Sequence, residues 1–120
     1  MSAVDREIET LIRDSLTKQF PDDVILGEEH GGTGGARCWV IDPIDGTGNF
    51  AQGVPCFAVM AGLVRGGRTL AAWIHDPTTP ETAVAMAGEG AWLDGARLRV
   101  APGGPIETLR GTLHLSLIHI

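Results

Sequence analysis

Acidic, glycine and hydroxyl side chains gather in one short stretch of the sequence, residues 39–50. The stretch reads WVIDPIDGTGNF, so Asp42 and Asp45 are followed at once by Gly46 and Thr47. Two carboxylates at this spacing can share one hard cation, and a glycine lets a ligand approach the backbone closely. These residue types therefore indicate a cation that holds a phosphate group.

An apolar run ahead of Asp42 predicts the element that carries these groups. Residues 39–41 have the pattern of a buried strand, and Pro43 cannot donate to a sheet ladder, so the strand is expected to end at Asp42. Asp42 should then lie at the carboxyl end of a strand, where open sheets place their ligands. A helical turn is expected to follow, with Asn49 as its cap.

A second pair of acids, Glu28 and Glu29, follows another short predicted strand at residues 24–26. Adjacent acids on their own usually indicate a solvated loop. The aspartates downstream favour a role in the same site for Glu28, and less so for Glu29. Residues 30–37 are rich in glycine but lack both phosphate-loop signatures, so we interpret them as a mobile loop beside the site.

The other elements are expected to be one helix and a meander of antiparallel strands. Residues 4–19 predict an amphipathic helix that docks on the sheet through an apolar stripe of Ile8, Leu11, Ile12 and Leu16. Asp5 and Glu9 are interpreted as solvated acids one helical turn apart. The alternative, which the resemblance described below supplies, is that they match an aspartate and a glutamate common at this spacing in that family. Strands are expected at 57–64, 69–75, 82–86, 91–93 and 97–100, with hairpin turns at Gly66-Gly67 and Asp94-Gly95.

The composition fits one globular domain at most. The sequence has 120 residues, of which 43% are apolar, and a net charge of -6, which argues against a nucleic-acid-binding surface. No basic tract or long apolar run predicts contact with a membrane, and the N-terminus does not resemble a signal peptide. Cys38 and Cys56 have neither metal nor disulfide spacing, so a cytoplasmic location is expected.

Residues 39–50 together with Gly27-Glu28-Glu29 resemble the two N-terminal metal motifs of the inositol monophosphatase family. These proteins are magnesium-dependent, lithium-sensitive phosphomonoesterases. The resemblance runs from about Val4 to about Leu113 and implies the sugar-phosphatase fold, an α+β or layered α/β architecture with a largely antiparallel sheet. It implies hydrolysis of a small phosphate monoester, inositol monophosphate first. Histidinol phosphate, a 3′-phosphoadenosine nucleotide and fructose bisphosphate remain as alternatives.

The resemblance also implies a set of metal ligands. Glu28, Asp42 and the backbone carbonyl of Ile44 would bind one Mg²⁺ ion. Asp42 would bridge to a second ion, which Asp45 would also bind. Two or three ions in total are implied, with lithium as an inhibitor.

Catalytic and substrate-binding roles follow from the same resemblance. Glu28 and Thr47 would orient the attacking water, and the backbone N–H groups of Gly46 and Thr47 would hold the phosphate. Glu29 would support the site without binding a metal. Attack on phosphorus would be direct, without a phosphoenzyme.

Family chains continue further and carry a tryptophan–aspartate motif whose aspartate completes the second metal site, and no such motif is present here. We therefore interpret residues 1–111 as the truncated N-terminal part of the domain and residues 112–120 as a truncated tail, with foreign sequence as one interpretation of it. The full-length protein is expected to be a homodimer that acts on a small phosphorylated substrate and binds neither nucleic acid nor membrane. The non-catalytic alternative is an inactive metal-binding fragment.

Three other families use similar residues. An EF-hand loop needs acids two residues apart, whereas Asp42 and Asp45 are three apart. Aspartic proteases have a hydroxyl residue before the glycine, and here Gly46 precedes Thr47. Haloacid-dehalogenase phosphatases have one residue fewer between their acids and form a phosphoenzyme, so trapping a phosphoenzyme would favour them.

Overall fold

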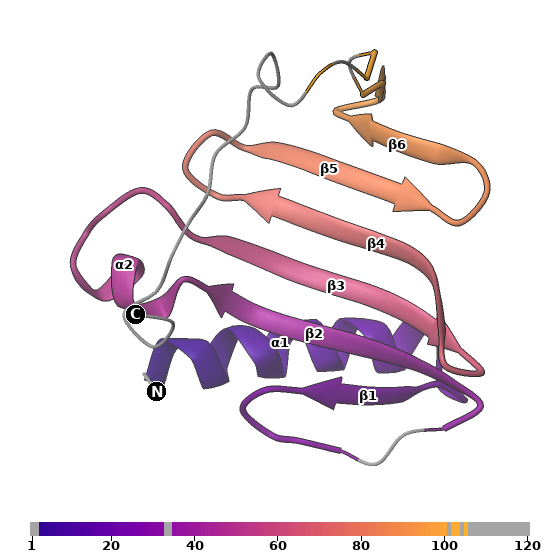
Figure 1. Ribbon diagram of the computed structural model, residues 1–120. Helices are drawn as coiled ribbons and strands as arrows, with labels where there is room; N and C mark the ends of the chain where they lie inside the picture. Colours follow the sequence, from indigo (N-terminus) through magenta and orange to yellow (C-terminus); the bar gives the residue numbers. More distant parts are fainter. Residues whose placement is uncertain (1–2, 33–34, 101, 104, 106–120) are drawn as a thin grey trace.

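The computed structural model describes residues 3–32, 35–100, 102–103 and 105 (Figure 1). These residues form helix α1 (Ala3–Gln19), the short helix α2 (Thr47–Ala51) and a sheet whose seven strands follow chain order. The strands are β1 (Val24–Gly27), β2 (Arg37–Asp45), β3 (Ala58–Arg65), β4 (Arg68–Asp76), β5 (Glu81–Met86), β6 (Gly90–Leu93) and β7 (Ala96–Leu98). β1 pairs with β2 in parallel, and every later pair is antiparallel. The predicted α+β class is confirmed.

The hairpins lie where turn chemistry predicts them. Gly66-Gly67 joins β3 to β4, and Asp94-Gly95 joins β6 to β7. Both turns place residues at positive φ, which glycine adopts without steric cost. Residues 33–34 of the glycine-rich segment and the whole tail at 112–120 lie outside the described residues, and the mobility expected for residues 30–37 stays a prediction. Within the described part, no helix is long and apolar enough to cross a membrane.

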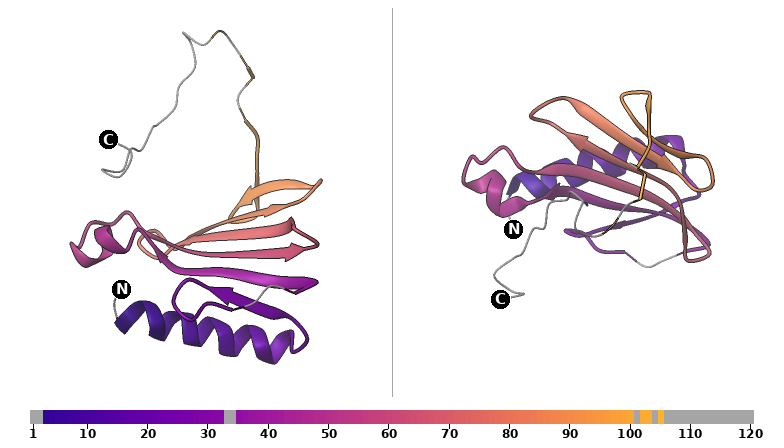
Figure 2. Two further views of the ribbon diagram at one scale, coloured as in Figure 1. Left: turned by 60° about the horizontal axis from the view of Figure 1, so that its bottom comes forward. Right: turned by 45° about the horizontal axis from the view of Figure 1, so that its top comes forward.

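Helix α1 lies against one face of the sheet and contacts mainly β2 (Figures 1 and 2). Figure 2 shows that it covers only the end of the sheet formed by β1 and β2. The side chains of Ile8, Ile12 and Leu16 are half-buried, as predicted. Leu11 is 62% exposed, so its predicted docking is wrong.

Two buried acids on α1 explain why Leu11 is exposed. Asp5 and Glu9 are 2% and 0% exposed, so their interpretation as solvated side chains is also wrong. They share a helical stripe with Ile12 and Leu16, at spacings that repeat every three to four residues. The face of α1 that meets the sheet is therefore centred on two carboxylates, and Leu11 is turned away from it.

The core lies between α1 and the middle of β2. Ile41 is 2% exposed, and Trp39 packs between Phe20 and Trp73 with ring centroids 5.2 Å and 5.5 Å away. The indole Nε1 of Trp39 donates to Asp23 at 3.0 Å, which satisfies its buried polar atom. This packing fixes the strand that leads into the acidic stretch.

Candidate functional site

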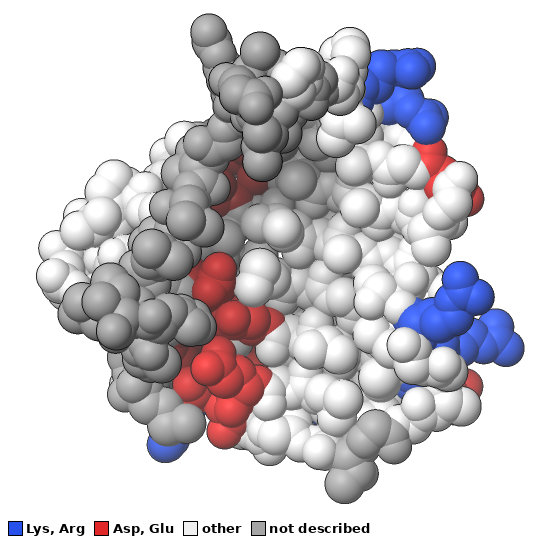
Figure 3. Space-filling model, in the orientation of Figure 1, with Lys and Arg blue, Asp and Glu red and all other residues white. Residues whose placement is uncertain are grey.

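The parallel pairing of β1 and β2 brings two acids to one edge of the sheet. The register pairs Gly27, the last residue of β1, with Ile41, so Glu28 and Asp42 each come one residue after the last parallel pair. Because parallel strands run in the same direction, both acids lie toward the carboxyl ends of the strands, near enough for the charge of Glu28 to act on Asp42. Figure 3 shows acidic surface gathered over this region, with the basic side chains largely on the opposite side. The expectation that Asp42 and Glu28 share a site fits this geometry.

Strand β2 does not end at Asp42, and this prediction is corrected by three residues. It continues through Pro43 to Asp45, and its register with β3 shifts between Asp42 and Asp45. Asp42 pairs with Met60 and Asp45 with Ala58, so three steps on β2 match two on β3. Pro43 lies inside this bulge, where the missing N–H interrupts no ladder bond.

Two short hydrogen bonds fix the conformation of the bulge. The backbone N–H of Ile44 donates to Asp42 Oδ1 at 3.1 Å. The hydroxyl of Thr47 donates to the carbonyl oxygen of Ile44 at 2.9 Å. The corner therefore brings together the carboxylate of Asp42, the carbonyl of Ile44 and the hydroxyl of Thr47, which the sequence resemblance groups in one site.

Gly46 begins α2 in a conformation that other residues rarely adopt. Its φ is 89°, and a Cβ added there would lie 2.9 Å from the carbonyl oxygen of Cys56. Gly46 is the N-cap, so the prediction of Asn49 as the cap is wrong. Asn49 lies within α2, and its side-chain amide donates to the Cys56 carbonyl at 2.8 Å. Among the described residues, no hydrogen bond uses the N–H of Gly46 or Thr47, so both can bind an anion.

The carboxylates at this edge repel one another. Burial, then the nearby charges of Glu28 and Asp45, raise the pKa of Asp42 above its ordinary value. The Ile44 N–H lowers this pKa, and Asp5 on α1 raises it further. A bound cation would offset this repulsion.

The donor atoms fit a hard cation. The carboxylates and the Ile44 carbonyl offer oxygen ligands, which Mg²⁺ prefers. No group of three or more His, Cys, Asp or Glu side chains in the described part of the chain is placed to hold a metal ion by itself. The donor set that the resemblance implies at this corner adds the backbone carbonyl of Ile44 to the carboxylates, and it stays a prediction.

Glu29 points away from solvent. Its side chain is 7% exposed, and its Oε2 has no hydrogen-bond partner among the described residues, although Arg6 Nε lies 3.7 Å away. Glu29 therefore forms an ion pair with Arg6 from a largely buried position. The role of Glu29 as a supporting residue stays a prediction.

Asp5 and Glu9 are the parts of this region whose burial our sequence interpretation did not predict. Asp5 adds to the negative potential at Asp42, and Glu9 accepts hydrogen bonds from the backbone of Glu29 and His30. The available signal was their position on the helix, because both lie on the stripe that contains apolar Ile12. An acid on the buried stripe of an amphipathic helix indicates a specific partner.

An open groove leads away from Glu28 and Asp42 across the sheet. Its volume is about 720 Å³, and its lining includes Val40, Met60 and Ile74. In the paired registers, Asp42, Met60 and Ile74 lie opposite one another, so they share one face of the sheet. The acids therefore lie at one end of an apolar surface.

Comparison with known proteins finds a matching family and several relatives of this chain. The sequence profile described as the inositol monophosphatase family matches residues 1–117. A fructose-1,6-bisphosphatase/inositol-1-monophosphatase of Thermotoga maritima is 38% identical over 93% of this chain and 44% of its own length. An inositol-1-monophosphatase of Rhizobium meliloti is 44% identical over 83% of this chain and 39% of its own length. The Nus factor SuhB of Escherichia coli K12 is 42% identical over 92% of this chain and 41% of its own length.

A solved structure shows the same arrangement of elements. The structure of a Thermotoga maritima IMPase superimposes with a TM-score of 0.81 at 40% identity, over 84% of this chain and 40% of that one. The chain thus spans about two fifths of the length of the curated relatives described above.

Proposed function

Because this chain belongs to the inositol monophosphatase family, we propose that the protein at the full length of its relatives hydrolyses a small phosphate monoester. Inositol monophosphate is the first candidate substrate. The observation that carries the proposal is the parallel register that sets Glu28 beside Asp42, directly ahead of the corner formed by Asp45, Gly46 and Thr47. That corner combines a cation site with free N–H groups suited to phosphate.

We assign the metal ligands as the resemblance implies them. Glu28, Asp42, the carbonyl of Ile44 and Asp45 would hold Mg²⁺, with two or three ions in the full-length protein and lithium as an inhibitor. Bound there, Mg²⁺ supplies positive charge that neutralises phosphoryl oxygens and makes a water molecule more acidic. The repulsion at Asp42 supports this assignment, because a cation would offset it.

The residues of the corner would divide the chemistry between them. The N–H groups of Gly46 and Thr47 would donate to phosphate oxygens and hold the ester in place. Thr47 commits its hydroxyl proton to the Ile44 carbonyl, so its oxygen can accept a hydrogen bond from the attacking water. Glu28 would orient the same water and accept its proton. The water oxygen would bond to phosphorus as the ester P–O bond breaks, and the leaving alkoxide would take a proton from solvent, which balances the proton accepted by Glu28.

A substrate panel tests this function. The full-length protein would be assayed for phosphate release in millimolar Mg²⁺, with and without lithium, on inositol monophosphate, histidinol phosphate, a 3′-phosphoadenosine nucleotide and fructose 1,6-bisphosphate. We expect Mg²⁺-dependent release that lithium inhibits and that Glu28→Gln abolishes. Metal-independent release, or full activity in Glu28→Gln, would overturn the proposal.

A Nus-factor role is the second candidate, because curated relatives from several bacteria carry the name Nus factor SuhB at 40–43% identity. The experiment is complementation of an Escherichia coli strain that lacks SuhB. Restoration by a full-length protein that releases no phosphate from the panel would favour this role over catalysis.

We further propose a cytoplasmic homodimer without nucleic-acid or membrane contacts, and light scattering of the purified protein checks the dimer.

A further inference from the structure

The buried carboxylate of Glu9 reaches from α1 to the turn that carries Glu28. Its side chain is fully buried, yet both of its oxygens have partners. Oε2 accepts the backbone N–H of Glu29 at 2.8 Å, and Oε1 accepts the backbone N–H of His30 at 3.2 Å. Arg13 Nε donates to Oε1 at 2.7 Å, and His30 Nδ1 lies 3.1 Å from the same oxygen. A charge this buried persists only with such partners.

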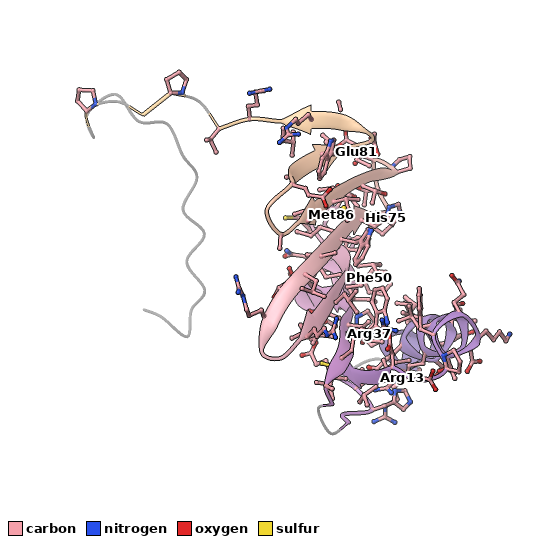
Figure 4. All side chains as sticks on the ribbon, turned by 90° about the vertical axis from the view of Figure 1, so that its right-hand side faces the viewer. Arg13, Arg37, Phe50, His75, Glu81 and Met86 are labelled. Atoms are coloured by element: carbon pink, nitrogen blue, oxygen red, sulfur yellow. The ribbon has the colours of Figure 1, made fainter. Side chains whose placement is uncertain are left out.

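Arg13 also binds the backbone at this turn. Its NH2 group donates to the Gly31 carbonyl at 2.6 Å, and its NH1 group donates to the Ile25 carbonyl at 3.2 Å. Figure 4 shows Arg13 between α1 and the edge of the sheet. The turn is closed by two backbone hydrogen bonds between Gly27 and Gly31, of 3.1 Å and 2.9 Å. Bonds from α1 therefore reach both ends of the turn.

The backbone of Gly27 lies directly against the Glu9 carboxylate. A Cβ added to Gly27 would overlap that carboxylate, so the close approach requires glycine here. By contrast, no hydrogen bond among the described residues holds the side chain of Glu28, which is exposed. Its placement beside Asp42 thus depends on the backbone of the turn.

We propose that Glu9, together with Arg13, is a positioning residue for Glu28: its carboxylate holds the backbone of residues 28–30 so that Glu28 lies beside Asp42. This inference rests on the proposed function, because it takes Glu28 as a metal ligand. Residues that orient metal ligands by hydrogen bonding typically change metal affinity or activity by about 10–100-fold when they are replaced. Glu9 acts one step further back, through the backbone, and we expect a loss in that range.

The test measures Mg²⁺ binding by calorimetry and Mg²⁺ activation of phosphate release in the full-length protein. Glu9→Gln keeps the size of the side chain but loses its charge and one acceptor. We expect its Mg²⁺ dissociation constant to rise about 10–100-fold. Turnover at saturating Mg²⁺ should stay within several-fold of the parent. Gly27→Ala, which pushes on the same carboxylate from the sheet side, should weaken Mg²⁺ binding in the same direction.

Two control variants separate positioning from general stability. Glu7→Gln makes the same chemical change at an exposed position of α1 and should leave Mg²⁺ binding unchanged. Asp23→Asn removes the charge that pairs with Arg37 and leaves one oxygen where Arg37 and the Trp39 indole now donate to two, so it should lower the melting temperature without weakening Mg²⁺ binding. If Glu9→Gln does not fold, Arg13→Lys takes its place, because it loses the forked contacts to Ile25 and Gly31 while the charge remains.

The outcomes distinguish this inference from the proposed function. Suppose that Glu28→Gln binds Mg²⁺ weakly in this assay. Normal Mg²⁺ affinity in folded Glu9→Gln would then overturn the positioning role. The same result in folded Arg13→Lys, where that variant takes its place, would also overturn it. Equal affinity in the parent and in Glu28→Gln would overturn the assignment of Glu28, and the positioning role with it. Equal weakening in Asp23→Asn and Glu9→Gln would show a stability effect alone and would also overturn the inference.

Discussion

At the scale of single residues, Asp42 is the ligand that the two proposed metal ions share. We expect Asp42→Asn in the full-length protein to lower Mg²⁺-dependent phosphate release by orders of magnitude, because it removes charge from both proposed ion positions. Circular dichroism should show a retained fold. Asp22→Asn, at an exposed turn, is the matched control and should keep full activity. Near-normal turnover in Asp42→Asn would contradict the ligand assignment.

The raised pKa of Asp42 makes a second, independent prediction about stability. Burial and the charges of Glu28 and Asp45 hold the folded pKa above the ordinary value of 3.8, so the folded protein binds this proton more tightly than the unfolded chain. The contribution of Asp42 to stability is then lost as pH rises through its folded pKa. Without Mg²⁺ at neutral pH, Asp42→Asn should melt at the same temperature as the parent or higher. A large drop in metal-free melting temperature would show that the charge stabilises the fold.

Thr47 is expected to act on the attacking water more than on the metal. Thr47→Ala should lower kcat by roughly 10²–10⁴-fold, the range typical of groups that handle protons. Thr47→Ser keeps the hydroxyl that donates to the Ile44 carbonyl and should retain most activity. A collapse of Mg²⁺ affinity with normal kcat at saturating Mg²⁺ would assign Thr47 to metal binding instead.

At the scale of elements, the bulge and α2 form a corner that depends on one glycine. Gly46→Ala would place a Cβ 2.9 Å from the Cys56 carbonyl at a φ of 89°, so we expect a loss of about 1–3 kcal/mol in stability. Gly48→Ala, two residues later in α2, meets nothing within 4 Å and should stabilise the protein by about 0.4–1 kcal/mol. Chemical denaturation of both variants measures the contrast, and equal effects would refute the role of Gly46.

Elements whose causes are local could be predicted from the sequence. The turn at Gly66-Gly67 follows from two glycines between apolar strands, and the strand that carries Asp42 follows from the apolar run ahead of it. The buried state of Glu9 depends on a turn about twenty residues away in the chain, so no local pattern could reveal its partners. The extension of β2 through Pro43 likewise needed the register with β3, since only a bulge makes proline acceptable there.

At the scale of the whole molecule, α1 is the element among the described residues that covers a face of the sheet, and it does so at one end. The opposite face carries the 720 Å³ groove, and Val40 and Ile74 on its lining are 45% and 47% exposed. Contiguous apolar surface of this kind marks a place where more protein packs or where chains associate. The curated relatives are more than twice as long as the part that this chain matches. We therefore expect the 120-residue polypeptide by itself to associate in solution and to bind a hydrophobic dye.

The same polypeptide should bind Mg²⁺ weakly and show little or no phosphatase activity. Under the proposed assignment, Glu28, Asp42 and the Ile44 carbonyl would hold one ion, and a second would have only Asp42 and Asp45. Without cations these carboxylates repel, which loosens the corner that holds Thr47. The measurement compares residues 1–120 with the full-length protein in one phosphate-release assay, in millimolar Mg²⁺ with and without lithium. Equal, lithium-sensitive turnover by the short chain would show that the metal ligands assigned above already suffice for catalysis.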